Sequence, residues 1–268
     1  MLIVLTLAVL VCMTAVMVAA WVFGLRRRNG GWTDVFWTFG SGAALAGAAL
    51  FPVSWGAAPG PRQWLVAGLV ALWSIRLGRY IAGRVSGHPE DARYARFRQD
   101  WGADYPRNML FVALPQAPAT ALLALSVLLA ARTQGAIGLR DVLGVAVLVL
   151  AILGEGLADA QMKMFKAAPA SRGQVCQAGL WGWSRHPNYF FEWLGWLAYP
   201  LIALDLTRPV TWLSFTAAAV MFILLTRISG IPPLEAAQLR SKGDAYRAYQ
   251  RRVSGFFPLP PRAPRGSA

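Results

Sequence analysis

Polar side chains collect at the start of one apolar segment in the second half of the chain. The stretch 179–193 reads "GLWGWSRHPNYFFEW" and places an Arg, a His, an Asn, a Tyr and a Glu among tryptophans. Pro187 suits the first turn of a helix, and Asn188 and Glu192 are four residues apart, hence on one helical face with Tyr189 beside them. An amide and a carboxylate on one face can hold a polar ligand by hydrogen bonds.

A second polar face lies on the preceding apolar segment. Glu155 and Asp159 are four residues apart, and Lys163 and Lys166 continue that face towards the end of the segment. Ionised groups inside a bilayer are costly and are retained mainly where they pair or serve a site. One interpretation is a simple pair between Asp159 and Lys163 across one helical turn. The other is that the two polar faces converge on a single polar ligand.

A third candidate is Asp34, the only acid of the apolar segment that follows "RRRNGGWT". Burial between Trp32 and Trp37 should favour its neutral, protonated form. A protonated carboxyl group in a dry pocket can donate a hydrogen bond to a carbonyl oxygen on which negative charge develops. The alternative is an acid in a first helical turn, favoured by the helix dipole, with Thr33 as the cap.

The composition indicates that a membrane surrounds these groups. The 268-residue chain is 56% hydrophobic and 14% charged, with a mean hydropathy of +0.45, above the apolar share of ordinary soluble domains. Segments of about 20 apolar residues cross a bilayer. We expect an all-α, polytopic protein with seven transmembrane helices near Leu2–Leu25, Val35–Phe51, Gln63–Ile81, Asn108–Ala131, Val142–Gln161, Pro187–Leu206 and Pro209–Thr226.

The positive charges predict the orientation of these helices, because Lys and Arg collect in cytoplasmic loops. All but four of the 26 basic residues fall on one side of the predicted topology; the exceptions are Arg62, Arg132, Arg140 and Arg208. The N-terminus is therefore expected outside and the C-terminus in the cytoplasm. Topology and attraction to anionic headgroups account for most of the net charge of +14, and without a groove-reading motif we expect no nucleic-acid partner.

The chain has no long linker and no visible repeat, so we expect residues 1–268 to form a single membrane domain. Residues 88–107 alternate aromatic and charged side chains and predict a short helix at the membrane interface. Residues 235–268 are expected to be a cytoplasmic tail whose helix ends near Gly255. Two cysteines and two histidines at these spacings predict no disulfide and no metal site.

Three segments carry a resemblance to a known family. They are "GLWGWSRHPNYFFEW", the preceding "LADAQMKMFKAAPASRGQVCQAGLW", and the later "SGIPPLE" with "GDAYRAYQRRVSGFFPLPP". The chain resembles, over roughly Arg76–Pro261, the bacterial membrane family of unknown function numbered 1295, which is related to the steroid 5-alpha-reductases. The resemblance implies a seven-span protein of the bacterial cytoplasmic membrane that binds NADPH in a cytoplasm-facing cavity.

The resemblance also suggests cofactor-binding residues. Asn188 and Glu192 match the positions that hold the nicotinamide end in the family's Asn-Tyr-Phe-Gly-Glu block, although Phe191 replaces its glycine. Asp159 matches an acid that contacts the adenosine part. Basic residues at the phosphates are matched by Lys163, Lys166 and Arg227, and the remaining matched cofactor residues are Arg185, His186 and Tyr189.

For catalysis, the resemblance is weaker. "WSIRLGRY" is similar to the segment with the catalytic tyrosine of the steroid enzymes, but Trp73 stands in the place of that tyrosine, and Asp34 matches their catalytic glutamate only by its position on the span. The implied function is NADPH-dependent reduction of a carbon–carbon double bond in a lipophilic, steroid-like enone. We expect this substrate to enter a monomeric enzyme from the lipid side.

Two alternatives remain open. "RHPNY" also resembles a motif of S-adenosylmethionine-dependent membrane methyltransferases, which usually carry paired glutamates after the last span, where this chain has only Glu235. The other alternative is a non-enzymatic lipid-binding or scaffolding protein in which the polar residues satisfy helix ends. A dinucleotide-binding Rossmann domain is not expected, because "GEGLAD" offers only part of its glycine fingerprint.

Overall fold

The computed structural model describes residues 1–54 and 56–263, and the regular elements in this part of the chain are all helices. A single isolated bridge between Ser184 and Ser254 is the only β pairing within it. Five helices are long and apolar enough to cross a membrane: Leu2–Arg27, Pro61–Val85, Arg93–Ala131, Leu139–Ala167 and Pro209–Arg252. The chain is therefore an all-helical protein with several candidate membrane spans.

Two of the seven expected spans are not among these five helices. Helix α2 (Trp32–Leu50) covers one of them. The other is divided at Leu197 into α8 (Pro187–Trp196) and α9 (Ala198–Ala203). Seven crossings and their orientation therefore remain predictions.

The contacts within the chain divide it into two compact units. Unit 1 comprises Met1–Val145 and Tyr199–Val220, and unit 2 comprises Ala146–Ala198 and Met221–Ala268. The chain passes from one unit to the other within α7 (Leu139–Ala167), at the start of α9 and within α10 (Thr216–Ile223). Residues 264–268 of the expected cytoplasmic tail lie outside the described residues.

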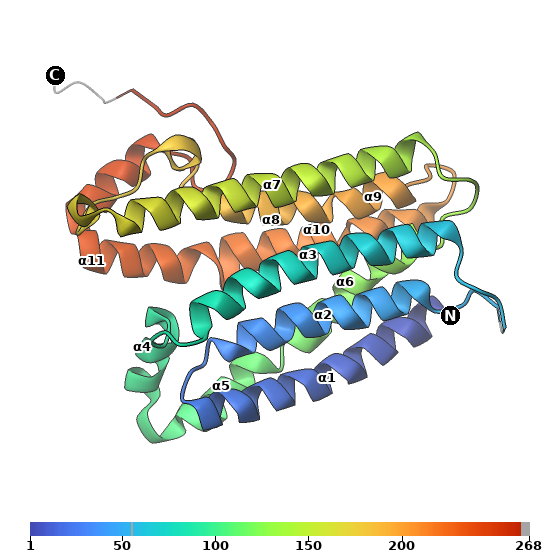
Figure 1. Cartoon of the computed structure of the whole chain (residues 1–268), viewed down its shortest axis with the longest axis horizontal. Helices are drawn as coiled ribbons and strands as arrows, with labels where there is room; N and C mark the ends of the chain where they lie inside the picture. Colours follow the sequence, from blue (N-terminus) through green and yellow to red (C-terminus); the bar gives the residue numbers. More distant parts are fainter. Residues whose placement is uncertain (55, 264–268) are drawn as a thin grey trace. The chain divides into compact units, whose positions relative to one another are not determined.

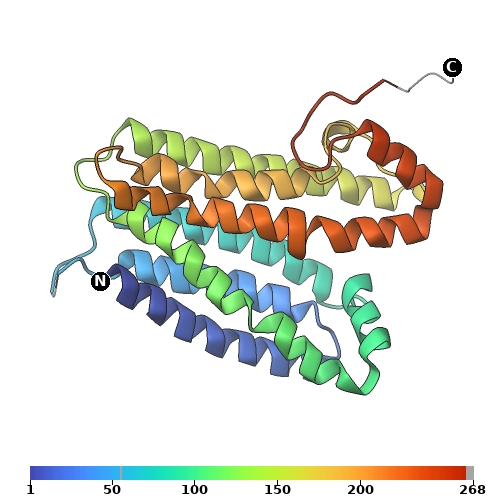
Figure 2. The same cartoon turned by 180° about the vertical axis from the view of Figure 1, so that it is seen from behind.

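In unit 1, α1 (Leu2–Arg27), α2 and α3 (Pro61–Val85) run side by side (Figure 1). Helix α6 (Gln116–Ala131) packs against them on the side seen in Figure 2. Small residues allow α2 and α3 to approach closely: the hydroxyl of Ser74 occupies the space beside Gly42 and donates to the Thr38 carbonyl over 3.0 Å. Such close packing is typical of membrane helices, where lipid is as apolar as leucine.

One end of unit 1 is closed by the segment that was expected to form an interfacial helix. It contains α4 (Ala92–Trp101), the 3-10 helix η1 (Gly102–Asp104) and the start of α5 (Tyr105–Ala113). Asp91 caps α4 by accepting from the backbone N–H of Arg93 over 3.0 Å. Tyr94, Tyr105 and Met109 form a buried cluster there. A short helix is therefore present in this segment, and its location at a membrane interface stays a prediction.

Unit 2 contains the later part of α7, the 3-10 helices η2 (Pro169–Ser171) and η3 (Gly179–Gly182), α8, the π-helix η5 (Leu224–Ile228) and α11 (Ile231–Arg252). Gly243, with φ +50°, kinks α11. Because α11 has seven charged residues, only the apolar part of Pro209–Arg252 before it is suited to a membrane interior. The predicted tail helix is confirmed and ends at Arg252, just before Gly255.

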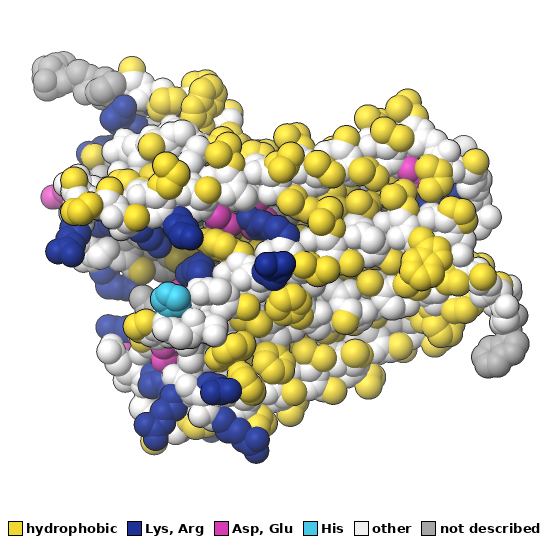
Figure 3. All heavy atoms as spheres, viewed as in Figure 1, with side chains coloured by type: hydrophobic (Ala, Val, Ile, Leu, Met, Phe, Trp, Pro, Cys, Tyr) yellow, Lys and Arg dark blue, Asp and Glu magenta, His cyan; other side chains and the backbone are white. Residues whose placement is uncertain are grey.

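The surface separates charge from apolar area within each unit. Lys and Arg side chains gather towards one end of the visible face, and hydrophobic side chains cover much of the remaining length (Figure 3). Large apolar side chains such as Ile3, Leu153 and Met164 are more than half exposed. A surface of this kind is suited to contact with lipid.

Candidate functional site

The stretch 179–193 folds as a 3-10 turn followed by a helix, and it lies against α7 within unit 2. The indole N–H of Trp181 donates to the Ala158 carbonyl over 2.9 Å, and the side chain of Gln161 accepts from the backbone N–H of Leu180 over 3.0 Å. Gly179 adopts a φ of +57°, which a side chain would strain. Pro187 begins α8, as the sequence predicts.

The polar residues at the start of this helix converge on one carboxylate, Glu235 of α11. Oε1 of Glu235 accepts from Nε of Arg185 over 2.6 Å and lies 3.2 Å from Nε2 of His186. Its other oxygen accepts from the Gln250 amide over 2.7 Å, and the hydroxyl of Tyr246 lies 3.4 Å from Oε1. We call these five residues the Glu235 cluster.

The cluster holds Glu235 as a carboxylate. Burial by itself would raise the pKa of Glu235, but hydrogen bonds from His186 and Arg185 and the positive charge of Arg185 lower it from 4.5 to about 2. Burial, followed by the charge of Glu235, raises the pKa of Tyr246 above its ordinary value. The tyrosine is therefore a neutral hydrogen-bond donor at neutral pH.

Arg185 also ties the chain together through the backbone. Nη1 donates to the carbonyls of Val253 and Gln250 over 2.7 and 3.2 Å, and its own N–H donates to the Ser254 carbonyl over 2.8 Å. The buried hydroxyl of Ser184 donates to the Phe256 carbonyl over 2.8 Å. The loop before α8 is thus hydrogen-bonded to the end of helix α11 and to residues 253–256, which follow it.

Asn188, Tyr189 and Glu192 stand on α8 immediately after this cluster. Glu192 is buried and accepts from the indole N–H of Trp196 over 3.0 Å. The ring of Tyr189 stacks on the ring of His186, with centroids 5.7 Å apart. Asn188 is half-buried.

The acids of α7 lie on its buried face. Glu155 is 6% exposed and Asp159 is 5% exposed, and Gly154 and Ala158 share that face. Lys163 and Lys166, one and two turns further, are exposed. The spacing predicts one polar face on this helix. The structure buries the two acids of that face and exposes its two lysines.

Phe191, which replaces the glycine of the family block, packs directly on α7. A Cβ added at Gly154 would collide with the Phe191 ring. Gly195, one turn later on α8, leaves space for Leu148 and Ala151. The bulk of Phe191 is therefore accommodated by the absence of a side chain at Gly154.

Asp34 does not have the surroundings that the sequence suggested. It lies in the first turn of α2, its side chain is 34% exposed, and its two oxygens accept from Nη2 of Arg93 over 2.8 Å and from the hydroxyl of Tyr94 over 2.9 Å. Both oxygens of the side chain are thus engaged by donors from the segment around α4. The expected capping by Thr33 is also not observed, because Gly31 is the N-cap and makes no side-chain cap.

Trp73 is buried in α3 and meets Trp37 edge-to-face, with ring centroids 6.0 Å apart. The indole N–H of Trp37 in turn donates to the Thr120 hydroxyl over 3.0 Å. These contacts describe a packed aromatic core of unit 1, and they contain no group that titrates near neutral pH.

The cofactor residues that the sequence suggested all fall in unit 2, and the two catalytic candidates fall in unit 1. Arg185, His186 and Tyr189 are brought together with Glu235, whereas Lys163, Lys166 and Arg227 are exposed at helix ends. Sequence reasoning did not assign Glu235, Tyr246 or Gln250 to the site. The signal available was a glutamate eight residues past Arg227, in "PPLEAAQL".

The described residues contain two free cysteines and no group of three or more His, Cys, Asp or Glu residues that could hold a metal ion. Cys176, on the loop before η3, is buried, and burial raises the pKa of its thiol. Neither cysteine has the exposed, electropositive surroundings of a reactive thiolate.

Comparison with known proteins places the chain in a family. The model of the family described as "Protein of unknown function (DUF1295)" matches residues 20–253. An uncharacterized protein of Schizosaccharomyces pombe, C594.04c, is 29% identical over 224 residues, which cover 74% of this chain and 63% of that protein, so the match spans less than two thirds of the relative. No solved structure matches the chain significantly. The chain belongs to the DUF1295 family.

Proposed function

We propose that this DUF1295 protein is a membrane-embedded, NADPH-dependent reductase that acts on a carbon–carbon double bond of a lipophilic enone, as the steroid 5-alpha-reductases do. The observation that carries the proposal is the burial of Glu155, Asp159 and Glu192 on two apolar helices of unit 2. Buried acids within membrane segments are expensive and mark functional sites more often than not.

The residues of unit 2 fit the chemical groups of NADPH. The phosphates require cations in contact with solvent, and Lys163, Lys166 and Arg227 are exposed basic residues at helix ends. The nicotinamide carboxamide requires a donor and an acceptor, which Asn188 and Glu192 supply one turn apart on α8. Asp159 would accept from the adenosine part. Arg227 lies on a π-helix, a conformation that is frequent at functional sites.

The Glu235 cluster has a positioning role in this proposal. Arg185 and His186 are held by Glu235, and the His186 ring stacks on Tyr189, so the start of α8 is fixed in place. A fixed start of α8 fixes the direction in which Asn188 and Glu192 project. These two residues would therefore meet the cofactor with little loss of conformational entropy.

Bound NADPH would supply the hydride, and the protein would have to polarise the substrate carbonyl. The contacts of Asp34 give no physical reason to assign this donor to it, because both of its oxygens already accept hydrogen bonds from Arg93 and Tyr94. Trp73 contributes packing. The proposal therefore depends on the cofactor residues of unit 2.

The membrane arrangement in the proposal has seven spans, with the N-terminus outside and unit 2's basic helix ends in the cytoplasm, where NADPH is available. It is supported by the five long apolar helices and by the basic residues in the last turns of α1 and α11. The membrane would be the bacterial cytoplasmic membrane, and the monomeric enzyme would take its substrate from the lipid.

One observation favours a second function, S-adenosylmethionine-dependent methyl transfer. Glu235, the one glutamate after the last span expected from the sequence (Pro209–Thr226), contacts both Arg185 and His186 of the "RHPNY" motif. The "RHPNY" motif and the single glutamate of "PPLEAAQL" are thus in direct contact. A site that needs Glu235 for a ligand would have to release it from four protein partners, which makes methyl transfer the second choice.

A binding titration with the full chain in detergent tests both functions and the non-enzymatic alternative. We expect NADPH to bind, and Asn188→Ala and Glu192→Ala to weaken binding at least about tenfold, since hydrogen bonds to charged groups are each worth about 1.5–3 kcal/mol. The matched control is Asp244→Ala, because Asp244 is exposed and pairs only with Arg247. Equal affinities for all variants would reject the assignment. S-adenosylmethionine binding without NADPH binding would support the second function. If neither cofactor binds, the non-enzymatic alternative is supported.

Turnover tests the substrate class. NADPH oxidation is followed with a panel of lipophilic and water-soluble enones, with a 3-oxo-4-ene steroid as surrogate. Turnover restricted to the lipophilic members is expected if substrates enter from the lipid. Turnover restricted to soluble enones would reject lipid-side entry.

A further inference from the structure

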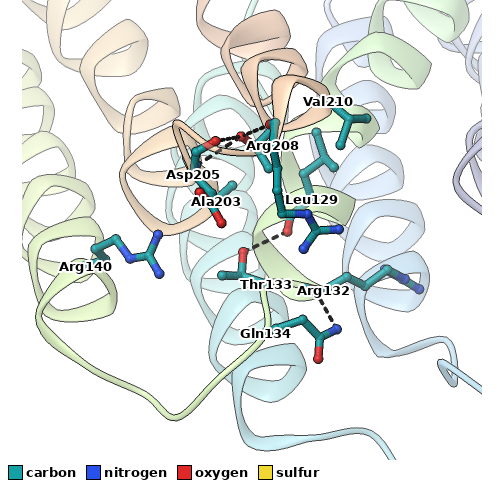
Figure 4. A pocket seen from close by; sticks show the side chains of 10 residues that line it. Leu129, Arg132, Thr133, Gln134, Arg140, Ala203, Asp205, Arg208 and Val210 are labelled. Carbon is teal, nitrogen blue, oxygen red and sulfur yellow. Dashed lines mark hydrogen bonds between the residues drawn. The ribbon is translucent and has the colours of Figure 1, made fainter.

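Unit 1 contains a polar pocket that the proposed function does not use. It has a volume of about 140 Å³ and lies where α6 ends, α7 begins and the 3-10 helix η4 (Pro209–Phe215) starts (Figure 4). Three arginines from three different elements, Arg132, Arg140 and Arg208, line it. The volume is sufficient for several water molecules or one small anion.

The guanidinium of Arg132 has unused hydrogen-bond donors. Its Nη2 donates to the carbonyls of Ala48 and Phe51 over 3.2 and 3.1 Å. Its Nε and Nη1 are buried and have no hydrogen-bond partner. Buried donors without a partner cost about 1–3 kcal/mol each, so a ligand or solvent is required to satisfy them.

Arg62 of α3, which contacts the loop after Arg132, is an example of an arginine with a structural role. Both of its outer nitrogens and its Nε are engaged: Asp141 accepts over 2.7 and 2.8 Å, and the carbonyls of Thr133, Gly135 and Ala136 accept the other donors. Arg62 thus fixes the loop that carries Thr133 and Gln134, two residues of the pocket wall. Arg132 has no such carboxylate among the described residues.

The one acidic residue of the pocket, Asp205, interacts with the charges of Arg140 and Arg208 without forming an ion pair with them. Asp205 accepts from the side-chain hydroxyl and the backbone N–H of Thr207, over 2.7 and 3.0 Å, which lowers its pKa below its ordinary value. No ion pair within 4.0 Å joins Asp205 to an arginine in the described residues. Three guanidinium groups and one carboxylate leave the pocket with an excess of positive charge.

Aromatic side chains place this pocket near a membrane surface. Trp212, which follows the pocket residue Thr211, is 53% exposed and stacks on Phe215, and Trp64 of α3 is 59% exposed. Exposed tryptophans concentrate at the depth of lipid headgroups. Arginine is the side chain best suited to phosphate, because its planar donors match the phosphate oxygens.

We infer that this pocket is a binding site for a phosphate group at the membrane surface. A phospholipid headgroup carries such a group at this depth, and free phosphate carries it in solution. Arg208 and Arg140 would meet the phosphate oxygens. Arg132, whose Nε and Nη1 lack a partner but are closed off from solvent, would add positive charge to the same wall. Nothing in this inference depends on NADPH or on unit 2.

Thermal unfolding of the full chain in a maltoside detergent, which has no phosphate, tests the site. We expect phosphatidylglycerol to raise the melting temperature and diacylglycerol with the same acyl chains to leave it unchanged. Arg208→Gln should weaken lipid binding, so that the half-saturating lipid concentration rises about tenfold, as expected for one lost charge-assisted hydrogen bond. Arg208 is exposed, and its side chain makes no hydrogen bond within the described part of the chain.

Two further variants and one soluble probe make the result decisive. Arg132→Lys keeps the charge and tests the unused donors, with its melting temperature without lipid as the check on folding. Arg240→Gln, an exposed arginine of α11, is the matched control and should respond to lipid as the natural protein does. An Arg208-dependent effect of inorganic phosphate alone would support the site with free phosphate as its ligand. Identical lipid responses of Arg208→Gln, Arg132→Lys and the natural protein would overturn the inference.

Discussion

Nε of Arg185 donates to Oε1 of Glu235 over 2.6 Å, and this ion pair joins the loop before α8 to α11. Both side chains are about 15% exposed, so the pair is largely removed from solvent. The pair links two segments that are fifty residues apart in the sequence. It is the shortest of the contacts that hold the Glu235 cluster together.

Removal of the carboxylate should destabilise unit 2. Glu235→Ala leaves Arg185 buried without its counter-charge, a change that costs about 3–5 kcal/mol in comparable pairs. Chemical denaturation in detergent measures the loss. Asp244→Ala, which removes an exposed acid of the same helix, should change the free energy of unfolding by less than about 0.5 kcal/mol. Similar small effects of both variants would show that the ion pair does not hold α11.

The same carboxylate should make stability depend on pH. The pKa of Glu235 is about 2 in the folded protein and ordinarily 4.5. A lowered folded-state pKa contributes stability that is fully present above the unfolded value and is lost as the pH falls through the folded value. The difference in melting temperature between the natural protein and Glu235→Gln should therefore shrink as the pH falls from about 5 towards 2. A constant difference over that range would contradict the assignment.

Gly154 and Phe191 should show coupled effects on stability. Gly154→Ala places a methyl group where the Phe191 ring lies, and overpacking of this kind costs about 1–3 kcal/mol. Phe191→Gly removes the ring but leaves a cavity. The double variant should be more stable than the sum of the two single effects predicts, because each change relieves the other. Additive effects in a double-mutant cycle would show that the two residues do not share this space.

Asp34→Leu distinguishes a structural from a catalytic role. The variant removes the acceptor of Arg93 and Tyr94. The side chains of the Arg93–Asp34 pair are 30% and 34% exposed, so the pair should contribute about 1 kcal/mol or less to stability. We expect a lower melting temperature and an unchanged rate of NADPH oxidation per folded molecule. The two quantities are measured on the same preparation. Loss of turnover with an unchanged melting temperature would return Asp34 to the catalytic residues.

The sequence by itself determined the helical class and much of the polar pattern. Long apolar runs predict long helices because backbone hydrogen bonds must be satisfied within each segment in lipid. The four-residue spacing of Glu155 and Asp159 placed both on one face, and the structure buries that face. Pro187 at the start of α8 and the short helix within 88–107 were predictable because their signals are local.

The tertiary structure decided which charges meet. Glu235 is fifty residues from Arg185, and Arg93 is 59 residues from Asp34, so no local spacing indicates either pair. Asp34 looked like a buried neutral acid because its neighbours in sequence are tryptophans, but α4 brings an arginine and a tyrosine hydroxyl to it. The protonation state of a carboxyl group depends on the charges around it in space, and these are fixed only when distant helices pack.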